Sequence, residues 1–247
     1  MTRAGLAIAA LAWVSASAVA QEAPLVADVS EHMVAITSDF TGKDVLLFGA
    51  IDAPGDIVVV VKGPPGPVAV HKKNRVGPIW INTQNIRFED IPSFYQAATT
   101  RPADEFVSEA LAARYQVGLD NLRLEPDAAG VAAEQIADFR AALTRLKIDS
   151  GHYQPEIGAV TMMSDRLFRT NLHFPANAPT GTYIVEVYLF RDGQVASAVI
   201  VPFIISKLGV GADITEFAKN FGWIYGLISI ALAVGAGWGA SAVFRRV

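Results

Sequence analysis

Apolar and polar residues alternate in short runs through the first ninety residues and again after residue 159. The runs are rich in β-branched residues and bounded by Gly, Pro and Asp, which is typical of β-strands and their turns. The predicted strands cover residues 33–40, 44–51, 57–62, 68–70, 79–82, 86–88, 160–163, 167–174, 183–191 and 195–206. Asp192-Gly193 between the last two runs predicts a tight hairpin. The pattern favours a mainly β fold, an immunoglobulin-like β-sandwich.

The spacing of apolar residues becomes helical between residues 101 and 150. A first helix is predicted after Pro102 and a second over residues 132–147. The apolar face of the first consists of Phe106, Val107, Ala110, Leu111 and Tyr115. We therefore expect a helical pair inserted at about 101–150 into a β domain spanning residues 21–206. One composite domain is favoured because each β half is short for a stable sandwich, although two domains also fit the pattern.

The C-terminal residues form the longest apolar stretch. Residues 222–244 contain no Asp, Glu, Lys or Arg. A helix of this length spans about 33 Å, close to the ~30 Å hydrocarbon core of a bilayer. Arg245 and Arg246 follow it, and the positive-inside rule places them in the cytoplasm. We expect one transmembrane helix, a juxtamembrane linker at 207–221 and a cytoplasmic tail at 245–247.

Residues 1–20 have the three parts of a secretory signal peptide. Arg3 precedes a short apolar core, and Ala18-Val19-Ala20 supplies small residues for cleavage before Gln21. Together with the positive tail, this predicts a single-pass protein of the bacterial inner membrane with its N-terminal domain in the periplasm.

Small residues recur along the predicted transmembrane helix at spacings that let two helices approach closely. The predicted helix-docking face consists of Gly222, Gly226, Ala231, Gly235 and Gly239. It favours docking on another membrane helix, from a partner protein or a second copy. The alternative interpretation is a Gly- and Ala-rich anchor.

Composition excludes several classes of function. The 247 residues carry a net charge of -4, which gives no electrostatic basis for binding nucleic acid. The chain has no cysteine, so disulfides, thiolate nucleophiles and cysteine-ligated metals are excluded. Its four histidines, at 32, 71, 152 and 173, lack the spacing of a metal motif, and no nucleotide-binding or nucleophile motif is present. We predict no catalytic, cofactor-binding or metal-binding residues, and hence no enzyme.

One basic run stands out in this acidic chain. It comprises His71, Lys72, Lys73 and Arg75, with Trp80 close behind. It is a candidate periplasmic interaction patch for an anion, a lipid headgroup or an acidic partner, and otherwise a solvated hairpin tip.

Five stretches together resemble one family. They are GPIWINT at 77–83, PSFY at 92–95, LFRT at 167–170, VYLFRDGQV at 187–195, and IYG at 224–226 with GAGWGASA at 235–242. They are similar to the alphaproteobacterial putative transmembrane protein family, uncharacterised proteins with a signal peptide, an exported region and one C-terminal span. The resemblance implies no catalytic residues, and it associates the chain with permeases of the sulfite-exporter type.

The favoured hypothesis is a non-enzymatic accessory protein that binds another membrane protein, with a sulfite-exporter type permease as the first candidate. A second hypothesis is a periplasmic binding or chaperone-like module that accepts a client strand at the sheet edge near Pro202. A third is a membrane-anchored hydrolase built from dispersed residues, which would bring histidines next to carboxylates.

Overall fold

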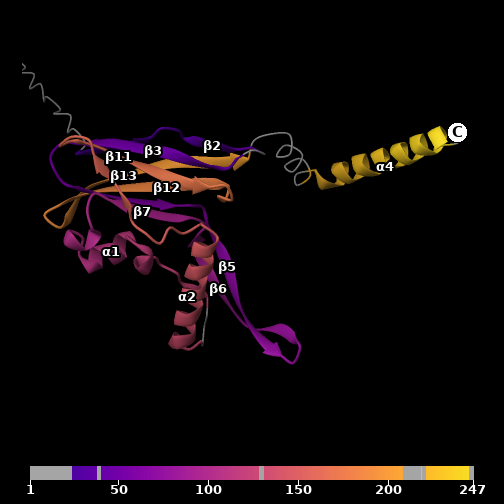
Figure 1. Cartoon of the computed structure of the whole chain (residues 1–247), viewed down its shortest axis with the longest axis horizontal. Coiled ribbons are helices and arrows are strands. Elements are labelled where there is room, and N and C mark those ends of the chain that lie inside the picture. Colours follow the sequence, from indigo (N-terminus) through magenta and orange to yellow (C-terminus); the bar gives the residue numbers. More distant parts are fainter. Residues whose placement is uncertain (1–23, 38–39, 128–130, 208–217, 219–220, 245–247) are drawn as a thin grey trace, which may run out of the picture.

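The computed structural model describes residues 24–37, 40–127, 131–207, 218 and 221–244 (Figure 1). Two sheets face one another within this part of the chain. The four-stranded sheet has the order β1 (Leu25–Val29), β3 (Gly42–Ile51), β11 (Leu167–Pro175) and β10 (Thr161–Met162). The six-stranded sheet has the order β2 (Met33–Ile36), β13 (Gln194–Lys207), β12 (Gly181–Arg191), β4 (Asp56–Lys62), β7 (Tyr95–Thr99) and β9 (Gly158–Ala159).

Alternate residues of the facing strands fill the core between the two sheets. Leu47 on β3 and Leu172 on β11 meet Val59 on β4 and Val185 on β12, and all four are fully buried. This alternation follows from the period of two along a strand, which directs one set of side chains inward. The prediction of a mainly β protein is confirmed, whereas the immunoglobulin-like form of the sandwich is not confirmed by this arrangement.

The outer face of the six-stranded sheet is also covered over β4, so this strand is buried on both sides. Every residue from Ile57 to Val61 has zero exposure. Val58 and Val60 point into a second core with Phe139 and Leu143 of α2 (Ala133–Asp149). Burial on both faces explains why the sequence of β4 is an unbroken apolar run rather than an alternating one.

The helical segment lies between β7 and β9 and covers this outer face. It contains η1 (Ala103–Glu105), α1 (Glu109–Tyr115), η2 (Leu119–Asn121), the short strand β8 (Pro126–Asp127) and α2. The first predicted helix is shorter than expected. Ser108 has an extended conformation (ψ 152°), so α1 begins after it, and Phe106 and Val107 enter the core from the preceding turn.

The predicted hairpin at Asp192-Gly193 is present between β12 and β13. Both turn residues have positive φ, 49° and 70°, as a type I′ turn requires. Pro202 faces Ile184 across this pair. The other side of β13 is paired with β2 only from Ile204 to Lys207, so Pro202 lies in the part of β13 left as an edge among the described strands.

A long hairpin leaves the two sheets and forms an arm (Figure 1). It consists of β5 (Pro65–Val76) and β6 (Ile79–Pro92), joined by Gly77-Pro78, and β8 adds two residues at its root. The three short strands predicted over 68–88 are parts of this hairpin. The basic run therefore lies within β5, and the tip is the apolar Ile79-Trp80-Ile81.

The arm begins where β13 ends. Gly181 at the start of β12 is paired with Ile205, two residues before Lys207. Pro64, immediately before β5, covers Gly181 so closely that a β-carbon there would lie 2.8 Å from the proline Cγ. The root of the arm and the exit toward the C-terminal helix thus share one end of the six-stranded sheet.

The C-terminal apolar residues form one uninterrupted helix, α4 (Gly222–Phe244), as expected. The signal peptide predicted at 1–20, most of the linker and Arg245–Arg246 lie outside the described residues.

Candidate functional sites

The arm carries all five residues of the predicted interaction patch. In its antiparallel register, Arg75 lies opposite Trp80 and Lys73 opposite Asn82. Directly opposed residues share a face of a two-stranded ribbon, so Trp80 lies among cations. Lys72 and Lys73 are neighbours along β5, so the period of two places them on opposite faces and gives both faces of the ribbon a positive charge. The register shift between them leaves Thr83 of β6 unpaired.

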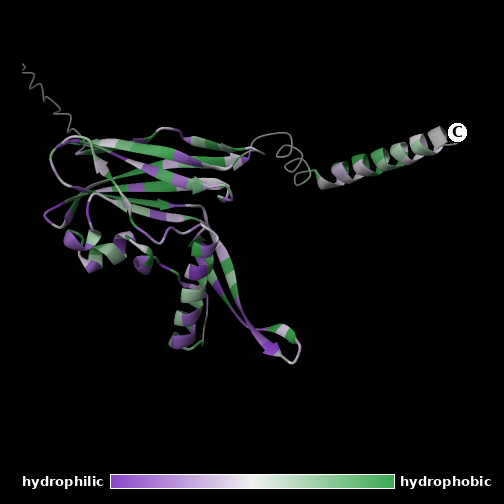
Figure 2. Cartoon of the chain, in the orientation of Figure 1, coloured by the Kyte–Doolittle hydropathy of each residue, from purple (hydrophilic) through white to green (hydrophobic). Residues whose placement is uncertain are grey.

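The tip exposes three large apolar side chains. Ile79 is 60% exposed, Trp80 66% and Ile81 40%. Gly77 forms the turn with φ 62°, which a side chain would strain. Figure 2 shows the hydrophobic tip separated from the hydrophobic root by a hydrophilic stretch. The tip is therefore a distinct apolar patch beyond the protein core.

The arm is positively charged in a negatively charged protein. Residues 68–88 include four cations, Lys72, Lys73, Arg75 and Arg87, and no Asp or Glu. Arg87 pairs with Glu89 at 2.6 Å. Among the described residues, the other three cations form no ion pair. Their charge is available to an external anion.

The root of the arm packs on α2 and leaves a basic hollow beside it. The hollow has a volume of about 490 Å³, and its lining includes Lys72, Lys73, Asp138 and Arg145, together with the imidazole of His71. One carboxylate faces three permanent cations there. This composition favours an anionic occupant.

Helix α4 is the second candidate site. Residues Gly222–Ser241 are apolar enough to cross a membrane, and none of this span is buried by the rest of the described chain. Trp223 and Trp238, one near each end, are both 72% exposed. A helix that is hydrophobic on all sides and uncovered in water is typical of a membrane span.

The helical phase separates the predicted docking residues into two sets. At about 100° per residue, Ala231, Gly235 and Gly239 lie about 160° away from the side that carries Gly222 and Gly226. A continuous stripe of small residues follows the latter side within a sector of about 80°. This small-residue stripe consists of Gly222, Gly226, Ser229, Ala233, Ala236 and Ala240.

The glycines of α4 have no packing role within the described chain. A β-carbon added at Gly222, Gly226, Gly235 or Gly239 would meet no atom within 4 Å. Each glycine inside a helix costs about 1 kcal/mol of helix stability relative to alanine. Small residues of this kind allow close approach of a second helix in a bilayer.

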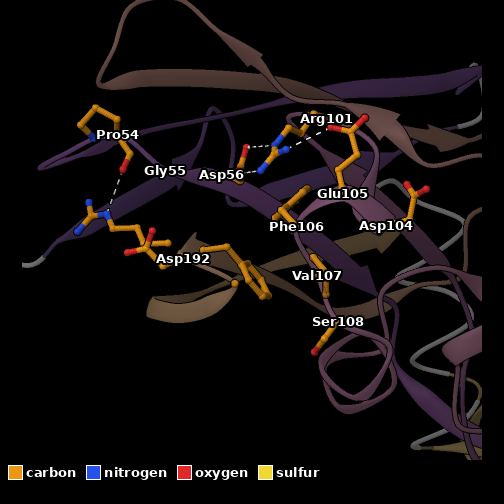
Figure 3. Close-up of a pocket in the computed structure, with 13 residues that line it drawn as sticks. Pro54, Gly55, Asp56, Arg101, Asp104, Glu105, Phe106, Val107, Ser108 and Asp192 are labelled. Carbon is orange, nitrogen blue, oxygen red and sulfur yellow. Dashed lines mark hydrogen bonds and ion pairs between the residues drawn. The ribbon is translucent and has the colours of Figure 1, made fainter.

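A cleft of about 710 Å³ lies where the β12–β13 turn approaches η1 (Figure 3). Arg101 donates two hydrogen bonds to Asp56, at 2.9 and 2.8 Å, and one to Glu105 at 3.2 Å. It also lies 5.0 Å from the ring centroid of Phe106. These contacts occupy the guanidinium and raise the pKa of Arg101, so the group acts as a clamp between η1 and β4.

The histidines are dispersed over separate elements. His32 lies 3.3 Å from Asp28 and His173 2.6 Å from Asp44, and both pairs are exposed. His152 contacts Ser150 and the backbone oxygen of Asn177. His71 is on the arm. In the described part of the chain, no group of three or more His, Asp or Glu residues has the arrangement of a metal site.

Several ionisable groups with shifted pKa values pack between the helical segment and the β7 region. Burial raises the pKa of Tyr95 and Tyr153, whose hydroxyls donate to Gln116 O at 2.6 Å and Pro92 O at 2.8 Å. Burial lowers the pKa of Lys147, which lies over the Tyr153 ring. These groups connect the helical segment to the β7 region.

The fold and α4 define a mainly β protein with one candidate membrane span. The chain belongs to the family described as "Putative transmembrane protein (Alph_Pro_TM)", which matches residues 24–246. Family membership and α4 both fit a membrane protein. None of the curated proteins matches the chain. It is similar to a solved structure, the crystal structure of BslA, a bacterial hydrophobin, with a TM-score of 0.26, 11% identity, and coverage of 75% of this chain and 96% of that chain.

Sequence reasoning missed the apolar tip and the small-residue stripe. The signal for the tip was Gly77-Pro78 between two β runs, which marks a tight turn. The signal for the stripe was the order of small residues along a single helical phase.

Proposed function

We propose that this protein is a non-enzymatic accessory subunit that docks on another integral membrane protein through the small-residue stripe of α4. The β domain and its arm lie in the periplasm, α4 spans the inner membrane and the C-terminus is cytoplasmic. A sulfite-exporter type permease is the first partner to test. The observation that supports this proposal is the small-residue stripe, which runs along one side of α4 from Gly222 to Ala240.

Close helix packing is the physical reason for preferring docking to anchoring. Lipid tails are as apolar as leucine, so helices associate in a bilayer through van der Waals contact and small residues at the interface. An anchor alone needs only hydrophobic length. The small-residue stripe is free of large side chains along most of α4, whereas Ile224 and Ile228 continue the side of Gly235 and Gly239 toward the other end.

The role of the small-residue stripe is tested by placing large side chains in it. We expect Gly226→Leu with Ala233→Leu to lower co-purification of the partner at least tenfold, because both side chains hold the helices apart. The matched control is Gly235→Leu with Gly239→Leu, which adds leucines on the other side. The measurement is quantitative capture from cross-linked native membranes, normalised to the membrane-inserted bait.

The outcome distinguishes the two faces of α4. Retained capture by the stripe variant, with loss in the control, would contradict the stripe and assign docking to Ala231, Gly235 and Gly239. Unchanged capture by both variants would contradict docking through α4 altogether.

Two other functions make different predictions. A chaperone-like module would use the edge of β13 near Pro202, so a synthetic β-strand peptide would compete with its client there. A hydrolase would depend on a histidine and carboxylate pair such as His173 and Asp44, and His173→Ala would abolish its activity. Neither the competing peptide nor His173→Ala is expected to affect docking through α4.

A further inference from the structure

We propose that the β5–β6 arm is a second membrane contact. The tip, Ile79-Trp80-Ile81, enters the headgroup region of an anionic leaflet, while Lys72, Lys73 and Arg75 bind lipid phosphates. This inference concerns the arm and stands independently of the partner proposed for α4.

The chemistry of the tip fits the interface of a bilayer. Tryptophan concentrates at the boundary between headgroups and acyl chains, because its ring is apolar and its N–H needs a polar partner. Trp80 projects from the ribbon between two exposed isoleucines. Transfer of each of these side chains from water to the apolar boundary is favourable.

The charge of the arm selects an anionic surface. Lysine and arginine near a membrane are attracted to anionic lipids, and the attraction adds up over the residues of a cluster. Lys72, Lys73 and Arg75 lie within five residues of the turn at Gly77, so the cations follow directly behind the tip along the ribbon. The basic hollow beside α2 adds Arg145 to this field.

The arm leaves the end of the six-stranded sheet from which the chain continues toward α4. The contact of Pro64 with Gly181 places the root of the arm beside the last residues of β13. Fourteen residues separate Lys207 from Gly222, a contour of at most about 50 Å. From Val70 to the turn at Gly77 the arm extends about 23 Å. Both membrane contacts are therefore within reach of one bilayer.

A small apolar and basic patch is sufficient for membrane contact when α4 already holds the domain at the bilayer. Three apolar side chains and three cations bind a free vesicle weakly, but α4 already confines the domain next to the bilayer. The second contact is then intramolecular, with an effective concentration in the millimolar range for a short linker. Cations on both faces of the ribbon favour a diffuse layer of headgroups over the complementary surface of a protein.

The absence of cysteine permits a direct test with single-cysteine labels in the full-length chain. Ile81→Cys reports the tip. Gln194→Cys is the matched control, since it is exposed beside the turn at the opposite end of β12 and β13. Each protein, labelled with a polarity-sensitive fluorophore, is reconstituted at about one chain per vesicle in phosphatidylcholine with or without phosphatidylglycerol. Brominated lipids serve as quenchers.

We expect quenching of the label at residue 81 in vesicles with phosphatidylglycerol, and none at residue 194. Lys72→Gln with Lys73→Gln and Arg75→Gln should lower the partition of the tip about 100-fold, at roughly fivefold per cation. Arg114→Gln with Arg166→Gln and Arg169→Gln removes three exposed cations elsewhere and should leave quenching unchanged.

Three results would overturn the proposal. A label at residue 81 that stays unquenched with phosphatidylglycerol would assign the tip to a protein partner. Equal quenching in the wild-type chain and in the variant without the three arm cations would show that anionic lipid does not bind the arm through these residues. Burial of the label only at high protein density would assign the tip to contact between two copies.

Discussion

Two aspartates at the centre of α4 are expected to remove the protein from the membrane fraction. Leu232 and Val234 flank the midpoint of the helix and lie outside the small-residue stripe. A charged side chain at the centre of a membrane helix costs about 2.5–3.5 kcal/mol, so Leu232→Asp with Val234→Asp costs about 5–7 kcal/mol. That is enough to reverse insertion of a span of moderate hydropathy. The measurement is the fraction of protein that resists alkaline extraction.

The control changes the same two positions while it preserves hydrophobicity. Leu232→Phe with Val234→Phe should remain in the membrane fraction. If the two aspartates leave extraction unchanged, α4 does not hold the protein in the bilayer, and the account of a single membrane span is wrong.

Loss of one aromatic ring is expected to destabilise the end of the sheets that carries the arm. Phe174 on β11 is fully buried, and its ring centroid lies 5.0 Å from that of Phe203, 5.2 Å from Phe94 and 5.5 Å from Tyr183. These rings join the two sheets. Phe174→Ala removes the central ring and leaves a cavity, so we expect a loss of about 3–5 kcal/mol in the free energy of unfolding.

Thermal unfolding of the full chain in detergent, followed by circular dichroism, measures this loss. For a domain of this size it corresponds to a decrease in Tm of about 10 °C. Phe48→Ala is the control on the adjacent strand β3, where the ring is 45% exposed, and it should cost below about 1 kcal/mol. Equal decreases in Tm for the two variants would contradict the assignment of Phe174 to the joint core.

Strands that bury one face were predictable from the sequence, because burial imposes a period of two. β11 shows this directly, with Phe168, Thr170, Leu172 and Phe174 buried and the residues between them exposed. The second core was not predictable in the same way. The run of β4 indicates burial on both faces, but the helical segment that covers its outer face is distant in sequence.

The arm was harder to predict because its distal half buries neither face. From His71 to Asn85 the pairing of β5 with β6 rests on backbone hydrogen bonds, and these leave no hydrophobic period in the sequence. The basic run was therefore recognised as a patch, while its position relative to the tip was not. For α4 the composition predicted the helix. The small-residue stripe is recognised only when each residue is assigned its angle around the helix axis, at about 100° per residue.

The central claim is that the protein recognises another membrane protein through α4. The most direct measurement is a cross-linked pull-down from native membranes with two baits, the intact chain and a chain whose Gly222–Phe244 helix is replaced by an unrelated apolar helix. The account predicts an integral membrane protein that is captured by the intact bait and lost from the exchanged one. Equal capture by the two baits would place recognition in the β domain and contradict the claim.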